Sequence, residues 1–315
     1  MTAKSYPYNS HCGDIGIRAV DGIEYIEQDS IETPAAYQDN PTWGIDRIDS
    51  RKGIDGYYNY NSNVQGEGVN VYLLDSGIQT SHNVFGGRAS LLFGRGDDSG
   101  HGTHCAGTAV GNTYGIARKA LIHSVKICYS GKCALIDTLD GLNKVLTHAG
   151  KNGGVISRSL SGLSFSSPSL TDAMKKMWDN GFVISHAAGN ANTFACYYTP
   201  QKMKEVIATG ATNKNDKRAY FSNYGKCVDL FAPGVSIVSA EYSTSSNSGT
   251  TTMSGTSMAC PHTSGVLALL MGKDKNATPQ SLKDALLSSA TSDVVSDTKG
   301  SPNRLLYANP VSMVF

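Results

Sequence analysis

The sequence contains no apolar run of about 18 residues, the length that a membrane-spanning helix needs. It also has almost no net charge, with 27 Lys and Arg residues against 26 Asp and Glu residues. Bulk charge therefore does not hold such a chain to nucleic acid or to a membrane surface. Residues 1–20 lack the basic-then-apolar order of a secretory signal peptide. We expect no membrane span and no nucleic-acid partner.

Glycine, by contrast, is abundant. The chain has 34 glycines among 315 residues, which suits many tight connections between strands and helices. Its length allows one large domain, with or without an appendage, and a substantial buried core. The seven cysteines are an odd number, so at least one stays unpaired within the chain. Composition alone allows a secreted or an intracellular protein.

Short apolar runs that end in small or polar residues predict buried parallel strands. They lie at residues 69–77, 120–128, 153–162 and 181–190. Helical patterns at 135–150 and 170–181 alternate with them. This alternation predicts an α/β fold, with a doubly wound, mostly parallel central sheet flanked by helices. Ligands bind such sheets beyond the carboxyl ends of the strands.

Two short stretches combine polar residues with glycine. Asp75 ends the predicted strand 69–77, where a single aspartate is more often a turn residue or a helix cap than a catalytic group. His101 lies between two glycines in "GHGTHCAGT", and alone it is consistent with a capping or metal-binding residue. His104 follows three residues later, without the glutamate that a zinc protease helix carries.

A third stretch, "SGTSMACPH" at 254–262, crowds small residues around Ser257 just before an apolar run. At a helix start, free N–H groups and the positive end of the helix dipole point toward such a hydroxyl. Gly255 leaves room for another chain to approach, and Pro261 removes at most one early helical hydrogen bond. The stretch therefore predicts a reactive oxygen beside positive potential that stabilises an oxyanion.

Together these stretches give the chain order Asp, His, Ser, which is the order found in subtilisin. Seven motifs are collinear with those of one family: "LLDSGI", "GHGTHCAGT", "SLSG", "AAGN", "SNYG", "FAPG" and "SGTSMACPH". On these motifs the sequence resembles the subtilisin-like serine proteases, most closely their proteinase K branch. The resemblance runs from about residue 35 to about residue 286.

This resemblance implies a serine endopeptidase that hydrolyses peptide bonds through an acyl-enzyme intermediate. Ser257 would be the nucleophile, His101 the base that takes its proton, and Asp75 the group that orients the histidine. Asn190 in "AAGN" would donate a side-chain hydrogen bond to the oxyanion. No cofactor is expected for catalysis.

The resemblance also implies where the substrate binds. An extended segment would pair with the substrate backbone as an added strand: Ser159, Leu160, Ser161 and Gly162. One wall of the primary specificity pocket would consist of Ala187, Ala188 and Gly189. The only acids between residues 155 and 200 are Asp172 and Asp179, both in a predicted helix. We therefore expect broad cleavage after apolar or aromatic residues, and no preference for Lys or Arg.

Three residues depart from the family pattern. Ser161 stands where the family usually has glycine, which leaves the shape of that subsite open. His186 replaces a small apolar residue, and we expect it to be buried and neutral. Arg158 is unusual beside a core strand, and the sequence gives no reason for it.

Five of the cysteines fall into three groups. Cys105 matches a free cysteine of the proteinase K branch and should lie under the catalytic histidine. Cys196 and Cys227 match a disulfide of relatives, and closing that loop stabilises the fold by roughly 3–4 kcal/mol in a chain-entropy model. Cys128 and Cys133 either close a small loop or form a reduced pair.

Two further expectations come from the resemblance. Asp216 aligns with a calcium-binding aspartate, so with backbone carbonyls and waters it would hold a structural Ca²⁺; a solvated loop acid is the alternative. Residues 1–34 resemble the end of an inhibitory propeptide, too short for the whole module, and so predict a partial propeptide-like leader. The catalytic domain would then span residues 35–315, with maturation between Ser30 and Asn40.

The expected protein is secreted and monomeric, and its partners are protein and peptide substrates and a propeptide or protein inhibitor. A different class of function is a catalytically impaired relative that binds peptides or inhibitors without cutting them. That alternative needs a cleft distorted at Ser161 or His186. Peptide ligation in place of hydrolysis is a third hypothesis, and no residue marks it.

Overall fold

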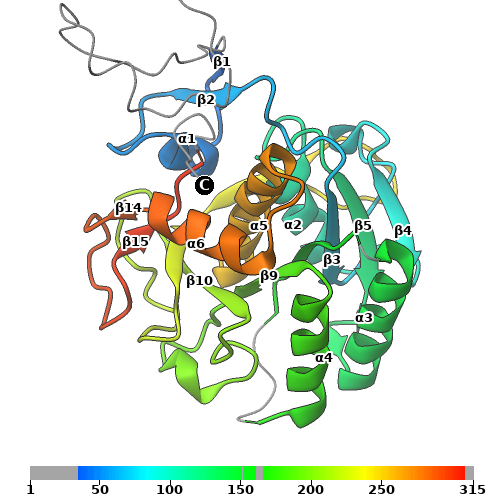
Figure 1. Cartoon of the computed structure of the whole chain (residues 1–315). Helices are drawn as coiled ribbons and strands as arrows, with labels where there is room; N and C mark the ends of the chain where they lie inside the picture. Colours follow the sequence, from blue (N-terminus) through cyan, green and yellow to red (C-terminus); the bar gives the residue numbers. More distant parts are fainter. Residues whose placement is uncertain (1–34, 151, 161–165, 309–315) are drawn as a thin grey trace, which may run out of the picture. The chain divides into compact units, whose positions relative to one another are not determined.

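A computed structural model describes residues 35–150, 152–160 and 166–308. Its main feature is a sheet of nine strands within these ranges (Figure 1). In sheet order the strands are β14 (Thr291–Ser292), β15 (Arg304–Leu305), β11 (Leu230–Pro233), β10 (Val206–Thr212), β9 (Phe182–Ala187), β8 (Gly154–Arg158), β3 (Asn70–Asp75), β5 (Leu121–Lys126) and β4 (Ala89–Phe93). Neighbours from β15 to β4 pair in parallel, and β14 pairs antiparallel to β15. The predicted mostly parallel α/β sheet is confirmed.

The apolar runs form strands because both of their faces are covered. Successive residues of β3 alternate between two hydrophobic cores: Val71 and Leu73 face one, and Tyr72 and Leu74 face the other. All four side chains are fully buried. Since both faces of a parallel sheet are packed against helices, its strands appear in the sequence as continuous apolar runs.

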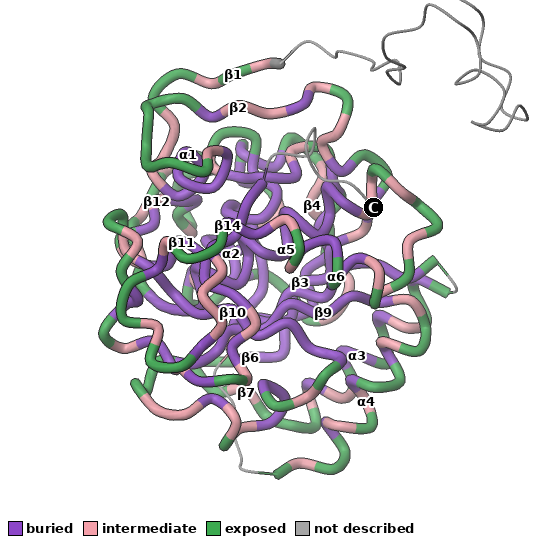
Figure 2. Tube along the Cα trace, turned by 60° about the vertical axis from the view of Figure 1, so that its left-hand side comes forward, coloured by how far each residue is buried: buried purple, intermediate pink, exposed green. Residues whose placement is uncertain are grey.

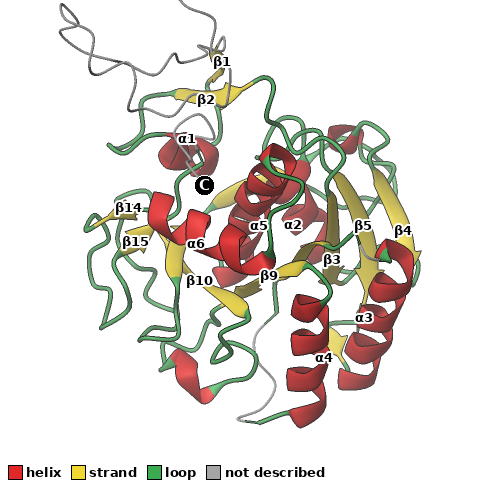
Figure 3. Cartoon of the chain, in the orientation of Figure 1, coloured by secondary structure: helices red, strands yellow, loops and turns green. Residues whose placement is uncertain are grey.

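Six α-helices are present in the described residues. They are α1 (Trp43–Asp49), α2 (His101–Val110), α3 (Leu135–Ala149), α4 (Pro168–Asp179), α5 (Thr256–Lys273) and α6 (Pro279–Ser289). Helices α2, α5 and α6 supply side chains to the core on one face of the sheet, and α3 and α4 to the core on the other (Figure 3). None of these helices is both long and apolar enough to cross a membrane.

Helix α5 lies at the centre of one layer. Every residue from Thr256 to Leu270 is buried, and the helix packs against α2 and strands β8, β9 and β10 (Figure 2). A helix covered on all sides needs no charged face, which explains why α5 has no Lys, Arg, Asp or Glu residue before Lys273. Its first turn is therefore held rigidly by the core.

Three two-stranded antiparallel sheets and two single-turn 3₁₀ helices complete the described fold. They are β1 (Ala35–Asp39) with β2 (Tyr57–Asn61), β6 (Cys128–Tyr129) with β7 (Lys132–Cys133), β12 (Ile237–Ala240) with β13 (Thr250–Met253), η1 (Asn83–Phe85) and η2 (Ala195–Tyr197). The predicted leader, residues 1–34, lies outside the described residues.

The strand order places a switch point beside β3. The chain pairs β5 on one side of β3 and, after α3, pairs β8 on its other side. Connections that leave a strand in opposite directions open a crevice beyond its carboxyl end. Asp75 is the last residue of β3, so it lies at that crevice.

Candidate active site

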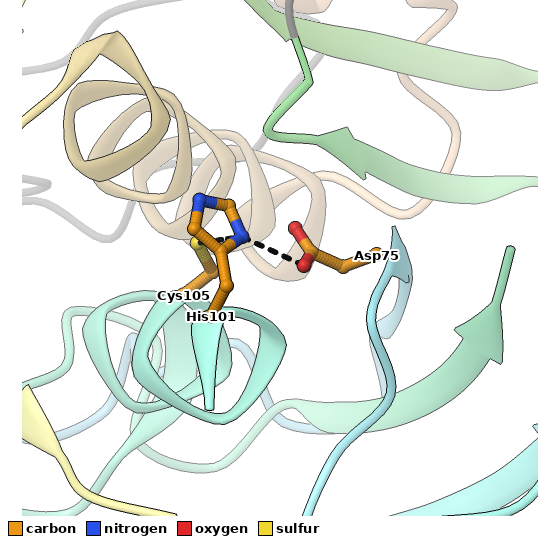
Figure 4. A group of neighbouring side chains, drawn as sticks. All are labelled: Asp75, His101 and Cys105. Carbon is orange, nitrogen blue, oxygen red and sulfur yellow. Dashed lines mark hydrogen bonds and ion pairs between the residues drawn. The ribbon is translucent and has the colours of Figure 1, made fainter. Parts of the chain in front are cut away.

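Asp75 and His101 meet at the carboxyl edge of the sheet. Asp75 ends β3, and His101 is the first residue of α2. His101 Nδ1 donates to Asp75 Oδ1 over 2.7 Å (Figure 4). Because a carboxylate only accepts hydrogen bonds, the proton of the neutral imidazole is on Nδ1, and Nε2 is left as a base.

The glycines beside His101 allow α2 to start against the chain that leaves β3. Gly100, at the N-cap, has a φ of 79°, in the left-handed region that favours glycine. A Cβ built on Gly102 would lie 2.0 Å from the carbonyl oxygen of Gly77. No side chain fits there. The "GHG" spacing therefore reflects the close approach that brings the imidazole to the carboxylate.

Asp97 holds the same two segments together, and the sequence analysis did not single it out. Ser76 Oγ donates to Asp97 Oδ1 over 2.8 Å and accepts from the N–H of Gly102 over 2.9 Å. Thr103 donates to Asp97 Oδ2 with its N–H and its hydroxyl, over 2.9 and 2.6 Å. An acid just before a helix start, where free N–H groups need acceptors, was the available signal.

The buried carboxylate sets the protonation of the histidine. Asp75 is 1% exposed, and its Oδ2 has no hydrogen-bond partner among the described residues. Its negative charge holds the pKa of His101 well above the ordinary 6.5, against the opposing effect of burial. The site therefore stabilises an imidazolium.

Ser257 lies in the first turn of α5, and Cys105 connects it to the histidine. Cys105 Sγ lies 3.3 Å from the carbonyl oxygen of Ser257 and 3.9 Å from His101 Nδ1. The Ser257 hydroxyl donates to the carbonyl of Ser159 over 2.9 Å, and no hydrogen bond of the described residues joins it to His101. The buried Cys105 thus lies beside the histidine, as predicted.

Pro261 explains why a thiol contacts the Ser257 carbonyl. In a regular helix the N–H four residues later would donate to that carbonyl, but Pro261 has none. The thiol of Cys105 donates to it instead. Cys260 is also free and buried, and it packs against Ser185, with 3.4 Å between Cys260 Sγ and Ser185 Oγ.

Asn190 has its side chain fixed beside Ser257. Its Oδ1 accepts hydrogen bonds from the N–H and the hydroxyl of Thr256, over 2.8 and 2.9 Å. Thr256 Oγ1 in turn accepts from the N–H of Gly189 over 3.0 Å. Because Oδ1 takes both bonds, the amide Nδ2 remains as a donor next to the start of α5. Thr256 has a positioning role that the sequence analysis missed.

The predicted substrate-binding residues are only partly described. Ser159 is buried, Leu160 is half-buried, and Ser161 and Gly162 lie outside the described residues. Among the predicted wall residues, Ala187 and Ala188 are fully buried. Gly189 has a φ of 105°, and a Cβ there would lie 2.4 Å from Asn223 Nδ2, so this position requires glycine.

Arg158 and His186 form a buried pair behind that wall. They are register partners on β8 and β9, and both are almost fully buried. Arg158 Nη1 donates to His186 Nε2 over 2.5 Å, and His186 Nδ1 donates to the Ala187 carbonyl over 2.7 Å. Burial, and then the charge of Arg158, lower the pKa of His186 to about 3. The neutral, buried His186 is confirmed, and it gives the unusual Arg158 an acceptor.

The two disulfides of the described residues join Cys128 to Cys133, which the sequence left open, and Cys196 to Cys227, as predicted.

Asp216 is less suited to its predicted role as a calcium ligand. Arg47 donates to both of its carboxylate oxygens, over 2.7 and 2.9 Å. A calcium ion would have to compete with this guanidinium, so these residues do not fit the ion well, and the calcium site stays a prediction.

Comparisons with known proteins agree with one another. Residues 66–307 match the model of the Subtilase family. The chain is 42% identical to an extracellular serine proteinase of Thermus sp. (strain Rt41A) over 90% of this chain and 70% of that protein. It is 38% identical to a cuticle-degrading serine protease of Arthrobotrys oligospora, over 90% and 72% of the two chains.

A solved structure gives the same result. The crystal structure of a cold-adapted subtilisin-like serine proteinase superimposes with a TM-score of 0.79 and 39% identity, covering 85% of this chain and 98% of that one. The family match spans well over half of the sequence. The chain therefore belongs to the subtilase family, and it is a serine-type endopeptidase.

Proposed function

We propose that this endopeptidase works through a triad of Asp75, His101 and Ser257 and an acyl-enzyme intermediate. The observation that carries the proposal is the 2.7 Å hydrogen bond between His101 Nδ1 and Asp75 Oδ1, beside the first turn of α5. In the reactive state the Ser257 hydroxyl turns from the Ser159 carbonyl to His101 Nε2. Catalytic hydrogen bonds often form only once substrate is bound.

The chemical steps then follow from the positions of the groups. His101 Nε2 takes the proton of Ser257 as the oxygen attacks the peptide carbonyl, and Asp75 stabilises the imidazolium. His101 gives the proton to the departing amine, which leaves an acyl-enzyme. Water, deprotonated by the same nitrogen, then releases the acid and restores Ser257.

The oxyanion would be held by Asn190 Nδ2 and the N–H of Ser257. Asn190→Ala is expected to lower kcat by about 10²–10³-fold with little change in KM, because the donor acts mainly on the charge of the transition state; this range is the one known for an oxyanion asparagine of subtilisin. Steady-state kinetics on one peptide would measure the loss. Asn143→Ala, at an exposed position on α3, is the control and should stay within a few-fold of wild type. Equal losses in both variants would contradict the assignment.

The proposed substrate cleft binds the acyl half of the peptide along Ser159–Gly162 and the wall Ala187–Gly189. The side chain before the scissile bond would be apolar or aromatic. Two features support this preference. The wall has no charged side chain, and the buried Arg158 pairs with His186, the residue just before the wall, so its positive charge would disfavour Lys and Arg at that position.

Secretion, maturation from a zymogen between Ser30 and Asn40, a monomeric state and sensitivity to protein inhibitors are further parts of the proposal. Disulfides are typical of oxidising compartments, and the structure contains two. The Thermus relative is named extracellular.

A fluorophosphonate probe tests the proposed nucleophile. Wild-type protein should take up one equivalent of probe at Ser257, and intact mass and peptide mapping would locate it. Ser257→Ala should take up none, whereas Ser254→Ala, a nearby hydroxyl on the same loop, should react normally. An unlabelled wild type would support the catalytically impaired alternative, and labelling elsewhere would reject Ser257 as the nucleophile.

A further inference from the structure

Two adjoining hollows are lined by residues that include Asn192, two residues along the chain from the proposed oxyanion donor Asn190. The larger, of about 420 Å³, is lined by Asn192, Asn213, Lys217, Arg218, Phe221 and Lys299, among others. The smaller, of about 400 Å³, shares Asn213 and Val235 with it and adds Trp43 and Lys214. Together they form what we call the basic hollow.

Hydrogen bonds connect the basic hollow directly to the active site. Asn192, two residues after Asn190, donates from its N–H to the Phe221 carbonyl over 2.8 Å. On the other wall, the residues flanking Val235 contact the loop before Ser257. The Gly255 N–H donates to the Gly234 carbonyl, and the Ser236 N–H donates to Ser254 Oγ, each over 2.8 Å.

The acyl half of the substrate is assigned to the segment that begins at Ser159, and the hollow, which that segment does not line, is available to the leaving half. Asn192 lies at most about 7 Å along the chain from Asn190, and an extended peptide advances about 3.3 Å per residue. A leaving half that passes Asn192 would place its second and third residues at the hollow.

The charge of the basic hollow is strongly one-sided. Four cations line it, Lys214, Lys217, Arg218 and Lys299, against the single carboxylate of Asp297. Asp297 is already paired with Arg218, over 3.0 Å. Within the residues that the structure describes, none of the three lysines is paired with a carboxylate.

The individual cations differ in the hydrogen bonds and ion pairs that they already make. Arg218 is buried and donates to backbone carbonyls, so it is structural. Among the described residues, Lys299 Nζ contacts a neutral oxygen, Asn192 Oδ1, at 3.2 Å, and the ring of Tyr224. Within the described residues, Lys217 Nζ has no hydrogen bond or ion pair. Beside them Tyr220 is 83% exposed and offers an aromatic surface to a peptide.

We infer that the basic hollow is a subsite for acidic side chains of the substrate, at the second and third positions after the scissile bond. The inference rests on the proposed function, since it needs a peptide bound across Ser257. An incoming carboxylate would lie between Lys217 and Lys299, neutralise two free ammonium groups and pack against the rim aromatics. This subsite would make the enzyme prefer substrates with acidic residues after the scissile bond, whatever residue precedes that bond.

Three fluorescence-quenched peptides with the same acyl half test this subsite. They carry Glu, Gln or Lys at both positions after the first leaving-side residue. At low salt, kcat/KM should be about fivefold higher for Glu than for Gln, and lower for Lys than for Gln; 0.5 M NaCl should remove most of the difference. In the double variant Lys217→Gln/Lys299→Gln, the ratio of kcat/KM for the Glu peptide to kcat/KM for the Gln peptide should fall to about one. The Gln peptide itself should be cleaved as before.

The charge-matched control is Lys144→Gln/Lys176→Gln, which removes two exposed lysines on α3 and α4. It should keep the fivefold ratio. A wild-type ratio of one, or a ratio that survives in the Lys217/Lys299 variant, would overturn the subsite while cleavage of the Gln peptide leaves the proposed function intact. Failure to cleave any of the three peptides, together with no probe uptake, would overturn the proposed function and the subsite with it.

Discussion

Replacing Ser257 by alanine is expected to lower kcat by about 10⁶-fold, and replacing Asp75 by asparagine by about 10⁴-fold. The first magnitude is the loss known for removal of the triad serine from subtilisin. Without the Ser257 oxygen no acyl-enzyme forms, so only binding and the oxyanion donors remain to accelerate hydrolysis. In Asp75→Asn the nucleophile and base are both present, but the amide favours the wrong imidazole tautomer and carries no charge to stabilise the imidazolium.

The Asp75 variant has a second readout that a merely structural defect would not produce. The charge of Asp75 is the largest cause of the raised pKa of His101. His101 must be neutral to act as a base, so kcat/KM in the wild type should fall as the pH drops through this raised pKa. In Asp75→Asn, the fall of kcat/KM at low pH should move to a lower pH, and the maximum value of kcat/KM should be reduced.

Two comparisons complete this experiment. The double variant Ser257→Ala/Asp75→Asn should be no less active than Ser257→Ala, since the residues act as one unit. Asp98→Asn is the control. This carboxylate pairs with Lys126 over 3.0 Å at the same sheet edge, and its loss should cost only a few-fold. Additive losses, or a fall of kcat/KM at the wild-type pH in Asp75→Asn, would argue against the triad.

The sequence predicted the fold because its signals are local. Each core strand is a continuous apolar run, and α3, α4 and the start of α5 are marked by periodicity or by small residues around Ser257. The resemblance to the subtilases then named Asp75, His101 and Asn190. The structure brings Asp75 and His101 together and places Asn190 beside the helix start.

What the sequence could not predict depends on contacts between distant segments. Arg158 and His186 are 28 residues apart, and only the pairing of β8 with β9 makes them neighbours. Arg47 and Asp216 are 169 residues apart, so no local motif could show that these two side chains pair. Asp97 acts through a loop and a helix start that no single motif covers.

Acid should destabilise this protein sharply. Burial lowers the pKa of His104, His123 and His262 to about 4, and that of His186 to about 3. Each of these pKa values lies below the value near 6.5 of a histidine in the unfolded chain. At a pH between the two values, the unfolded chain therefore binds more protons than the folded protein does. Stability is therefore complete above about pH 6.5 and falls as the pH drops toward these lower values.

The expected loss of stability in acid is large compared with the total unfolding free energy of an ordinary protein. At pH 5 each of the four histidines costs about 2 kcal/mol, on the order of 8 kcal/mol together, against a typical unfolding free energy of about 5–15 kcal/mol. The raised pKa of His101, and that of Asp49 at about 6, act in the opposite direction and reduce the loss. Urea unfolding of Ser257→Ala protein, which cannot digest itself, should show a loss of several kcal/mol between pH 8 and pH 5.

The Arg158–His186 pair allows one contribution to be isolated. His186→Leu alone leaves the buried Arg158 cation without its acceptor and should cost about 3–5 kcal/mol at pH 8. Replacing both residues by leucine removes the charge and the titrating ring together, so stability at pH 8 should return to about the starting value. The loss between pH 8 and pH 5 should then shrink by about 2 kcal/mol, the share of His186. If the double variant lost as much stability on acidification as its parent, this histidine would not be one of the groups that acid must protonate.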